Sequence, residues 1–269
     1  MHTIEKFLQE LALFPERENG LRNIKRYSLY TTMIYRTNLW MHTRRVAWIV
    51  KELLPLAEKV FDTDFDPDRA LALALVHDDA EIIFGDIQAG NKAKMKKEEL
   101  DDIKKLEQDA IEKLVQRYPS GLGQYVYRDL LQEAFHKTSL ESMIVDWADK
   151  YDAFGEALHE LYAGNISWTI HVENQYGKID LPIEYYVKYF RLFQEKFPQS
   201  KALFQEQNNW FAIPPEPDIS DIVQQGSLYT KESLDVKKGY DFYDQWIAVT
   251  LHNGTREDIE QLHTIKEKI

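Results

Sequence analysis

Apolar residues recur at helical spacing along most of this chain, which predicts an all-α protein. In one long stretch, Leu140, Met143, Ile144, Trp147 and Tyr151 fall on a single face of a helix. Only the segment 27–37 has a β-prone composition, and it lacks clean alternation. The expected helices cover residues 4–14, 38–60, 67–76, 94–118, 125–135, 140–161, 182–197, 201–211, 245–252 and 255–268.

Breakers divide this pattern. Asp66 followed by Pro67 is a strong helix start, because the aspartate can accept from a free N–H group and proline fits the first helical position. Pro55 lies inside the expected helix 38–60 and predicts a kink or a break there. Residues 15–20 are expected to interrupt the helical pattern, and residues 85–90 to form a loop.

The prolines after Ile213 end the helical pattern. We therefore divide the chain into a domain of residues 1–211 and a C-terminal segment of residues 212–269. The segment is rich in large aromatic residues and too short to bury a stable core of its own. It is expected to pack on the domain or at a dimer interface.

The most informative residues follow the almost unbroken apolar run 70–76. A helix that is apolar nearly all round is buried on most sides, so His77 and Asp78 at its end are expected to be partly desolvated. Desolvated charges are costly unless they are paired or bind a metal. A divalent cation is the simplest candidate.

Composition narrows the chemistry of such a site. The 269 residues include no cysteine, so a metal would be held by His, Asp and Glu, as in hydrolytic sites rather than zinc fingers. A formal net charge of -12 argues against a binder of nucleic-acid polymers. No apolar stretch approaches the roughly 20 residues that span a bilayer, and the first residues do not resemble a signal peptide. We therefore expect a cytoplasmic protein with no membrane partner.

The order of the chemistry-bearing residues resembles that of the HD-domain metal-dependent phosphohydrolases. His42 lies on the core-facing stripe of the expected helix 38–60, His77 and Asp78 are adjacent, and Asp149 lies on a distant helix. The resemblance implies an all-α HD-domain helical bundle in which these four residues hold one divalent ion. The sequence does not distinguish Co, Mn, Mg, Ni, Fe and Zn.

Within that superfamily the chain resembles the HD-domain 5'-deoxynucleotidases over roughly residues 20–200. His77-Asp78, Glu81, Gly85-Asp86 and Lys92 match that family's H-D-x-x-E-x-x-x-G-D-x-x-x-x-x-K stretch. Upstream, Arg26-Tyr27 and residues 36–38 are similar to its R-W and R-T-E-N segments. The acidic position of R-T-E-N is lost here, Tyr27 replaces the tryptophan, and Met41 stands where an acidic residue usually precedes the first histidine. The departures leave the metal ligands intact and the substrate preference open.

The same resemblance assigns roles to further residues. Glu81 is the expected general acid/base, or else a solvated helix end, and Asp86 the expected sugar contact, or else a turn cap. Arg26 and Lys92 are expected to bind phosphate, although Lys92 could belong to an exposed lysine run. Tyr27 could stack on a base or simply pack.

From the residues alone, Asp149 falls away from the apolar stripe of its helix, so a solvated acidic face is the alternative to a ligand. The nearby Asp146 and Asp152 are interpreted as surface charges.

The resulting hypothesis is a metal-dependent phosphohydrolase that releases phosphate from deoxyribonucleoside 5'-monophosphates. Its small-molecule partner is a nucleotide, and the resemblance favours a homodimer. Two alternatives stay open. One is a nucleoside triphosphate, cyclic-nucleotide or pyrophosphate hydrolase of the same superfamily, and the other is a metal-loaded nucleotide-binding or scaffold protein without turnover.

Overall fold

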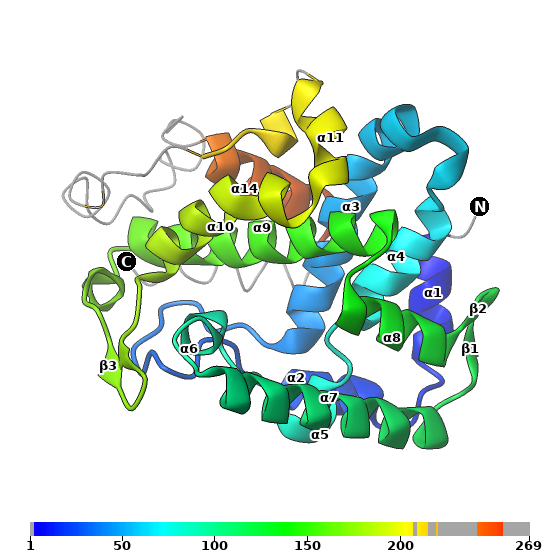
Figure 1. Ribbon diagram of the computed structural model, residues 1–269, viewed down its shortest axis with the longest axis horizontal. Coiled ribbons are helices and arrows are strands. Elements are labelled where there is room, and N and C mark those ends of the chain that lie inside the picture. The colour runs from blue at the N-terminus through cyan, green and yellow to red at the C-terminus, as the bar shows by residue number, and fades with distance from the viewer. Residues whose placement is uncertain (1–2, 207–208, 215–218, 220–240, 255–269) are drawn as a thin grey trace. The chain divides into compact units, whose positions relative to one another are not determined.

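The structure is a computed structural model that describes residues 3–206, 209–214, 219 and 241–254 (Figure 1). Helices dominate these ranges, and the strands in them form only two short antiparallel pairs, which confirms the all-α prediction. The chain divides into two compact units, each of them discontinuous in sequence. Among the described helices, none combines the length and the apolar composition that a bilayer crossing requires.

The first unit contains residues 1–26, 37–87 and 95–149. Its elements are α1 (Ile4–Leu11), α2 (Arg17–Asn23), α3 (Leu39–Phe61), η1 (Asp62–Asp64), α4 (Pro67–Val76), α5 (Glu81–Phe84), α7 (Lys97–Arg117), β1 (Gly121–Leu122), β2 (Tyr125–Val126), α8 (Tyr127–His136) and the first part of α9 (Leu140–Tyr162).

The second unit contains residues 27–36, 88–94 and 150–269. Its elements are α6 (Ala89–Lys92), the remainder of α9, η2 (Ile166–Thr169), β3 (Glu173–Asn174), β4 (Gly177–Lys178), α10 (Pro182–Lys196), η3 (Pro198–Ser200), α11 (Lys201–Gln205), η4 (Asn209–Phe211) and α14 (Asp241–Asn253).

Helix α4 is the buried centre of the first unit. Every residue from 70 to 76 is at most 3% exposed, as the apolar run predicts. Helix α3 lies beside α4 (Figure 1), and α8 and α1 contact it as well. Asp66 caps α4 by accepting from Arg69 N at 3.0 Å, and Pro67 takes the first helical position, so the predicted start signal is confirmed.

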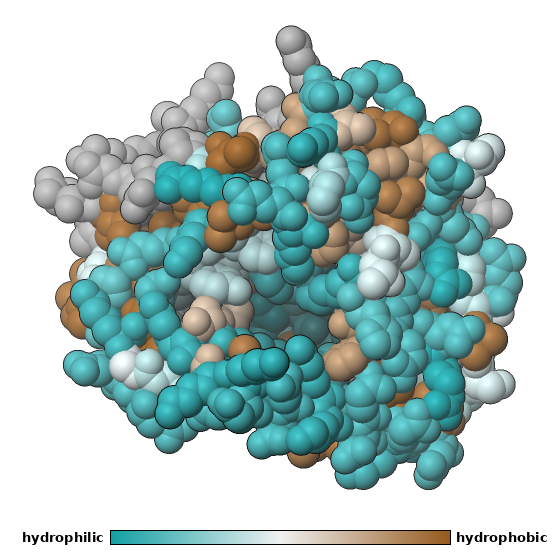
Figure 2. Space-filling view, in the orientation of Figure 1, coloured by the Kyte–Doolittle hydropathy of each residue, from teal (hydrophilic) through white to brown (hydrophobic). Residues whose placement is uncertain are grey.

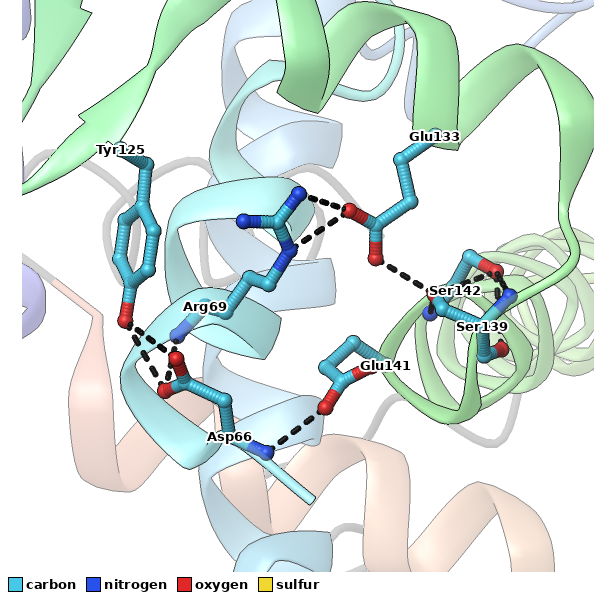
Figure 3. Close-up of polar contacts among 7 residues, drawn as sticks. All are labelled: Asp66, Arg69, Tyr125, Glu133, Ser139, Glu141 and Ser142. Atoms are coloured by element: carbon cyan, nitrogen blue, oxygen red, sulfur yellow. Dashed lines mark hydrogen bonds and ion pairs between the residues drawn. The ribbon is translucent and has the colours of Figure 1, made fainter. Parts of the chain in front are cut away.

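A polar network fixes the start of α4 (Figure 3). The Asp66 carboxylate also accepts from the Tyr125 hydroxyl at 2.9 Å, and its backbone N–H donates to Glu141 of α9 at 2.7 Å. Arg69 pairs with Glu133 of α8 through Nε at 2.7 Å. Burial raises the pKa of the Glu141 carboxyl, although the N–H donated by Asp66 opposes the shift. Two other helices are thereby joined to the first turn of α4.

Two interruptions expected from the sequence differ in the structure: there is no break at Pro55, and the interruption after α1 covers residues 12–16 and not 15–20. Helix α3 continues through Pro55 without a break, because buried residues on both sides of the proline hold the helix in place. Helix α2 begins at Arg17, inside the segment 15–20. Its start follows Glu16, whose φ of 59° is a turn conformation that the sequence does not reveal.

Helix α7 is the most polar long helix of the first unit. It buries Ala110, Ile111 and Leu114, and its outward side carries charged residues, some of them in pairs such as Lys105 with Asp102. That side forms the hydrophilic band along the lower edge of Figure 2. The charged residues of α7 therefore form a solvated helix face.

In the second unit, α14 packs on α9. The Trp246 indole is fully buried and donates from Nε1 to Asp152 Oδ1 at 2.7 Å, while Tyr151 donates to the Phe242 carbonyl at 3.1 Å. Of the predicted C-terminal segment, residues 215–218, 220–240 and 255–269 lie outside the described residues, and with them the expected helix 255–268. Helix α14 begins four residues before the expected start at residue 245.

Two aspartates interpreted as surface charges are buried. Asp152 is 0% exposed and accepts from the Trp246 indole, and Asp146 is 2% exposed and pairs with Lys137. The interpretation fails because both partners come from elsewhere in the chain, and the periodicity of α9 contains no information about them.

Gly155 is the point at which α9 admits the Trp246 ring. A Cβ at residue 155 would lie 2.2 Å from Trp246 Cγ, far inside contact distance. We expect Gly155→Ala to lower the free energy of unfolding by about 1–3 kcal/mol, because an overpacked core must shift. Helix propensity alone would change it in the opposite direction, by about 1 kcal/mol. Urea unfolding followed by Trp fluorescence measures the effect.

Gly121→Ala is the matched control, because its new Cβ would lie 3.4 Å from the Tyr125 carbonyl oxygen, which is ordinary contact. Equal or higher stability of Gly155→Ala would show that α14 does not depend on this close approach.

Candidate metal centre

Three helices of the first unit bring the candidate ligands together. His42 lies in the first turn of α3, His77 and Asp78 follow the last residue of α4, and Asp149 lies in the first part of α9. Asn38 fixes the start of α3 by accepting from Met41 N at 3.0 Å. The burial of α3 and α4 therefore dictates where three of these side chains lie.

The ligand atoms of His42, His77 and Asp78 all lie within 4.8 Å of one another. His42 Nε2 is 3.4 Å from Asp78 Oδ2 and 3.3 Å from Asp149 Oδ1. The structure therefore brings His42, His77 and Asp78 into one cluster, and Asp149 lies beside this cluster at His42. The His42 side chain is 0% exposed, against 7% for His77, 17% for Asp78 and 14% for Asp149, so the carboxylates are the more open side.

The donor set fits a divalent cation. Nδ1 of His77 lies 2.8 Å from the Ala74 carbonyl oxygen, which assigns the ring proton to Nδ1 and leaves a lone pair on Nε2. This Nε2 atom is buried and makes no hydrogen bond to any described residue. Two imidazoles and two carboxylates suit a borderline or hard divalent ion. A centre of this composition can hold such an ion.

Asp78 is present as a carboxylate. Burial opposes its ionisation, but the neighbouring His77 and the hydrogen bond and charge of His42 outweigh burial, so the pKa of the Asp78 carboxyl lies below its ordinary value. Asp149 acts in the opposite direction through like-charge repulsion. Two carboxylates that both lie next to His42 make a site that attracts positive charge.

Glu81 and Asp86 follow in the same unit. Glu81 begins α5, its backbone N–H donates to the Asp78 carbonyl at 3.0 Å, and its Oε2 atom is buried. Gly85 ends α5 with a φ of 85°, a conformation that glycine adopts without strain, and half-buried Asp86 comes directly after it. Glu81 is therefore tied to the ligand turn through the backbone.

Arg26 is half-buried and is placed by the backbone pairing that precedes α3. Its N–H donates to the Thr37 carbonyl at 3.2 Å, next to the bridge between Lys25 and Asn38. The backbone of Arg26 is thus paired with Thr37, directly before the residue that caps the helix carrying His42.

The two remaining predicted substrate residues belong to the second unit. Tyr27 is 6% exposed, donates to the Ala153 carbonyl at 2.7 Å and packs edge-on against Trp168. Lys92 is the last residue of α6 and is half-buried. Gln88, just before α6, accepts from Tyr27 N and Ser28 N when its amide is oriented to satisfy both.

Sequence reasoning missed a buried group next to the ligands. Asp79 is 0% exposed and pairs with Arg17, whose Nε and Nη2 each lie 2.7 Å from one of its carboxylate oxygens. Burial opposes the charge on Arg17, but Asp79 outweighs it, so the pKa of the guanidinium is raised. The signal was the Asp78-Asp79 doublet, in which only one residue can face the centre.

The fold and the centre define a helical protein with a histidine and carboxylate site for a divalent cation. Residues 15–197, more than half of the chain, match the family described as 5'-deoxynucleotidase YfbR-like. The chain belongs to that family, which confirms the resemblance drawn from its motifs.

Curated relatives agree over part of their length. The chain is 31% identical over 133 residues to a 5'-deoxynucleotidase of Pectobacterium atrosepticum, a match covering 49% of this chain and 65% of the relative. It is 32% identical over 128 residues to a 5'-deoxynucleotidase of Yersinia pestis, covering 48% and 64%. The chain therefore spans just under two thirds of the length of these relatives.

Solved structures show a more distant likeness. A predicted metal-dependent phosphohydrolase from Magnetospirillum magnetotacticum matches 82% of this chain and 98% of its own at 18% identity, with a TM-score of 0.48. A conserved hypothetical protein from Pyrococcus furiosus matches 76% and 95% at 21% identity, with a TM-score of 0.44.

Asp149→Ala tests whether the fourth residue is a ligand. We expect the variant to fold and to bind Co²⁺ roughly 10-fold or more weakly, because a carboxylate at 3.3 Å from His42 is removed. Competition with a chelator measures the affinity. Asp101→Ala, on the solvated face of α7, is the control and should bind like the unchanged protein. Equal affinity of the two variants would remove Asp149 from the ligand set.

Proposed function

We propose that this protein is a metal-dependent phosphohydrolase that acts on nucleotides and releases phosphate from deoxyribonucleoside 5'-monophosphates. The observation that carries the proposal is the convergence of His42, His77 and Asp78, whose ligand atoms lie within 4.8 Å of one another. The match to the 5'-deoxynucleotidase family supports the substrate class. The names of the curated relatives agree with it.

In this proposal His42, His77, Asp78 and Asp149 hold one divalent ion. When bound, such an ion supplies Lewis-acid stabilisation of phosphoryl charge and lowers the pKa of water. His77 keeps its Nε2 lone pair directed to the centre because Nδ1 is committed to the Ala74 carbonyl. The two carboxylates reduce the net charge of the loaded centre, so a phosphate dianion needs further cations to bind well.

Arg26 and Lys92 are the cations that we assign to phosphate. A guanidinium binds phosphate oxygens through paired, charge-assisted hydrogen bonds, and an ammonium adds a point charge. Asp86 is assigned to the sugar of the substrate, and Tyr27 to its neighbourhood. The burial of Tyr27 favours packing over stacking on a base.

Glu81 is the proposed general acid/base. Hydrolysis forms a bond from a water oxygen to phosphorus, breaks the bond from phosphorus to the 5' oxygen, and moves one proton to that leaving oxygen. The Glu81 carboxylate can accept the proton from the water and return it to the leaving oxygen. Its position three residues after Asp78, with its backbone bonded to the Asp78 carbonyl, supports this role.

We further propose that residues 1–211 form the phosphohydrolase domain and that residues 212–269 pack on it or at a dimer interface. The packing of Trp246 and Phe242 on α9 supports this view. A homodimer remains a prediction from the family resemblance, and a cytoplasmic location a prediction from the composition of the chain.

Phosphate release from a panel of nucleotides tests the proposed reaction. We expect release from deoxyribonucleoside 5'-monophosphates, little from ribonucleotides, and none after EDTA treatment, with recovery on adding a divalent ion. Release of tripolyphosphate from nucleoside triphosphates would favour the alternative of a nucleoside triphosphate hydrolase. Nucleotide binding without turnover under every metal would indicate a binding protein.

Glu81→Gln separates proton transfer from metal binding. We expect the metal content to be unchanged and kcat to fall by roughly 100-fold or more, the usual contribution of a positioned acid/base. Glu112→Gln, an exposed residue of α7 paired with Arg128, is the matched control. A wild-type kcat for Glu81→Gln would reduce this residue to a helix-end charge.

A further inference from the structure

The turn that carries His77 and Asp78 is tied to the end of α4 at three successive points. The carbonyl oxygens of residues 74–76 lie 2.8 Å from Nδ1 of His77, 2.6 Å from Nη2 of Arg17 and 3.0 Å from the backbone N–H of Asp79, in that order. The last carbonyls of a helix have no partner within the helix, so they must find partners elsewhere. Here the partners come from the ligand turn itself and from α2.

Asp79 is the anchor on the side of the turn away from the ligands. Arg17 contacts both of its carboxylate oxygens, through Nε and Nη2, at 2.7 Å each. The Tyr127 hydroxyl at the start of α8 donates to Asp79 Oδ2 at 2.8 Å. The exposed fractions are 5% for Arg17, 0% for Asp79 and 0% for Tyr127. Asp79 is therefore buried, bound through both carboxylate oxygens, and held by residues of α2 and α8.

Stability alone is a weak explanation for this arrangement. A buried ion pair can often be replaced by apolar residues of similar volume without loss of stability, because burial of the two charges is itself costly. The pair instead determines the orientation of the two neighbouring aspartates. Asp78 and Asp79 are adjacent and chemically identical, and the Arg17 fork fixes which of them faces inward and which faces His42.

We infer that Arg17, Asp79 and Tyr127 form a positioning network that holds the turn 77–79 so that His77 and Asp78 keep the orientation needed to bind a metal ion. None of the three is placed to contact substrate or metal, so they are positioning residues and not catalytic ones. The inference rests on the proposed metal centre and adds the residues that organise it.

Tyr127→Phe tests the network with the smallest change, because it removes one hydroxyl and keeps the ring. We expect the variant to bind Co²⁺ about tenfold more weakly, the lower end of the effect of removing a residue that supports the ligands of a metal. Chelator competition gives the affinity, and the visible spectrum of bound Co²⁺ reports its geometry. Both are measured without substrate.

Tyr118→Phe is the matched control. Tyr118 is also buried, its ring centroid lies 6.1 Å from that of Tyr127, and its hydroxyl has no hydrogen-bond partner within the described part of the chain. This variant should bind Co²⁺ like the unchanged protein. Equal affinity of the Tyr127→Phe and Tyr118→Phe variants would overturn the inference.

A double variant, Arg17→Met with Asp79→Leu, separates positioning from stability. It removes both buried charges together and leaves neither of them unpaired. We expect a melting temperature of the metal-free protein close to that of the unchanged protein, with Co²⁺ affinity reduced more than in Tyr127→Phe. Unchanged affinity in a folded double variant would show that the pair only fills space. If the double variant does not fold, the Tyr127→Phe comparison decides.

The unchanged protein keeps the two proposals distinguishable. If it binds no Co²⁺ at all, the proposed metal centre fails and the positioning role fails with it. If it binds Co²⁺ and the network variants bind equally well, only the positioning role fails.

Discussion

The burial of α4 is the constraint on which the first unit depends. Seven successive residues of this helix are withdrawn from water, so the polar groups at both ends need partners within the protein. At its start, Asp66 caps the helix and joins it to α8 and α9 through Arg69 and Glu141. At its end, Arg17 and the turn after Val76 satisfy the last carbonyls. The candidate centre lies at the C-terminal end of α4. Its geometry is therefore a consequence of how the last carbonyls of a buried helix find their hydrogen-bond partners.

The helices were predictable because their signals are local. The run 70–76, the Asp66-Pro67 start and the stripe of α9 each depend on neighbouring residues alone, and the structure confirms them. The failures have a common cause. Helix α3 continues through Pro55 because packing outweighs the hydrogen bond that proline removes, and α2 begins at residue 17 after a left-handed turn at Glu16. Tertiary packing and turn geometry decide such boundaries.

The site was predictable only in part, for the same reason. His77 and Asp78 stand out because charge follows an apolar run, and the order of the motif added His42 and Asp149. The position of Asp149 on a helical wheel did not distinguish it, as a candidate ligand, from the acidic residues around it. Asp152 is buried because Trp246, 94 residues away, donates to it. A helical wheel reports the face of a residue, whereas burial of a carboxylate depends on a distant donor.

The adjacent carboxylates of residues 78 and 79 illustrate this dependence most directly. Both follow the same buried helix, so both bear a desolvation cost that requires positive charge nearby. Asp79 obtains it permanently from Arg17, with two contacts of 2.7 Å. Asp78 has histidines as neighbours, and it shares His42 with a second carboxylate, Asp149. A divalent cation bound here would offset the charges of both carboxylates and would use the lone pair on Nε2 of His77. With the proposed ion bound, the protein would meet one electrostatic requirement in two ways, through the Arg17 guanidinium for Asp79 and through a divalent ion for Asp78.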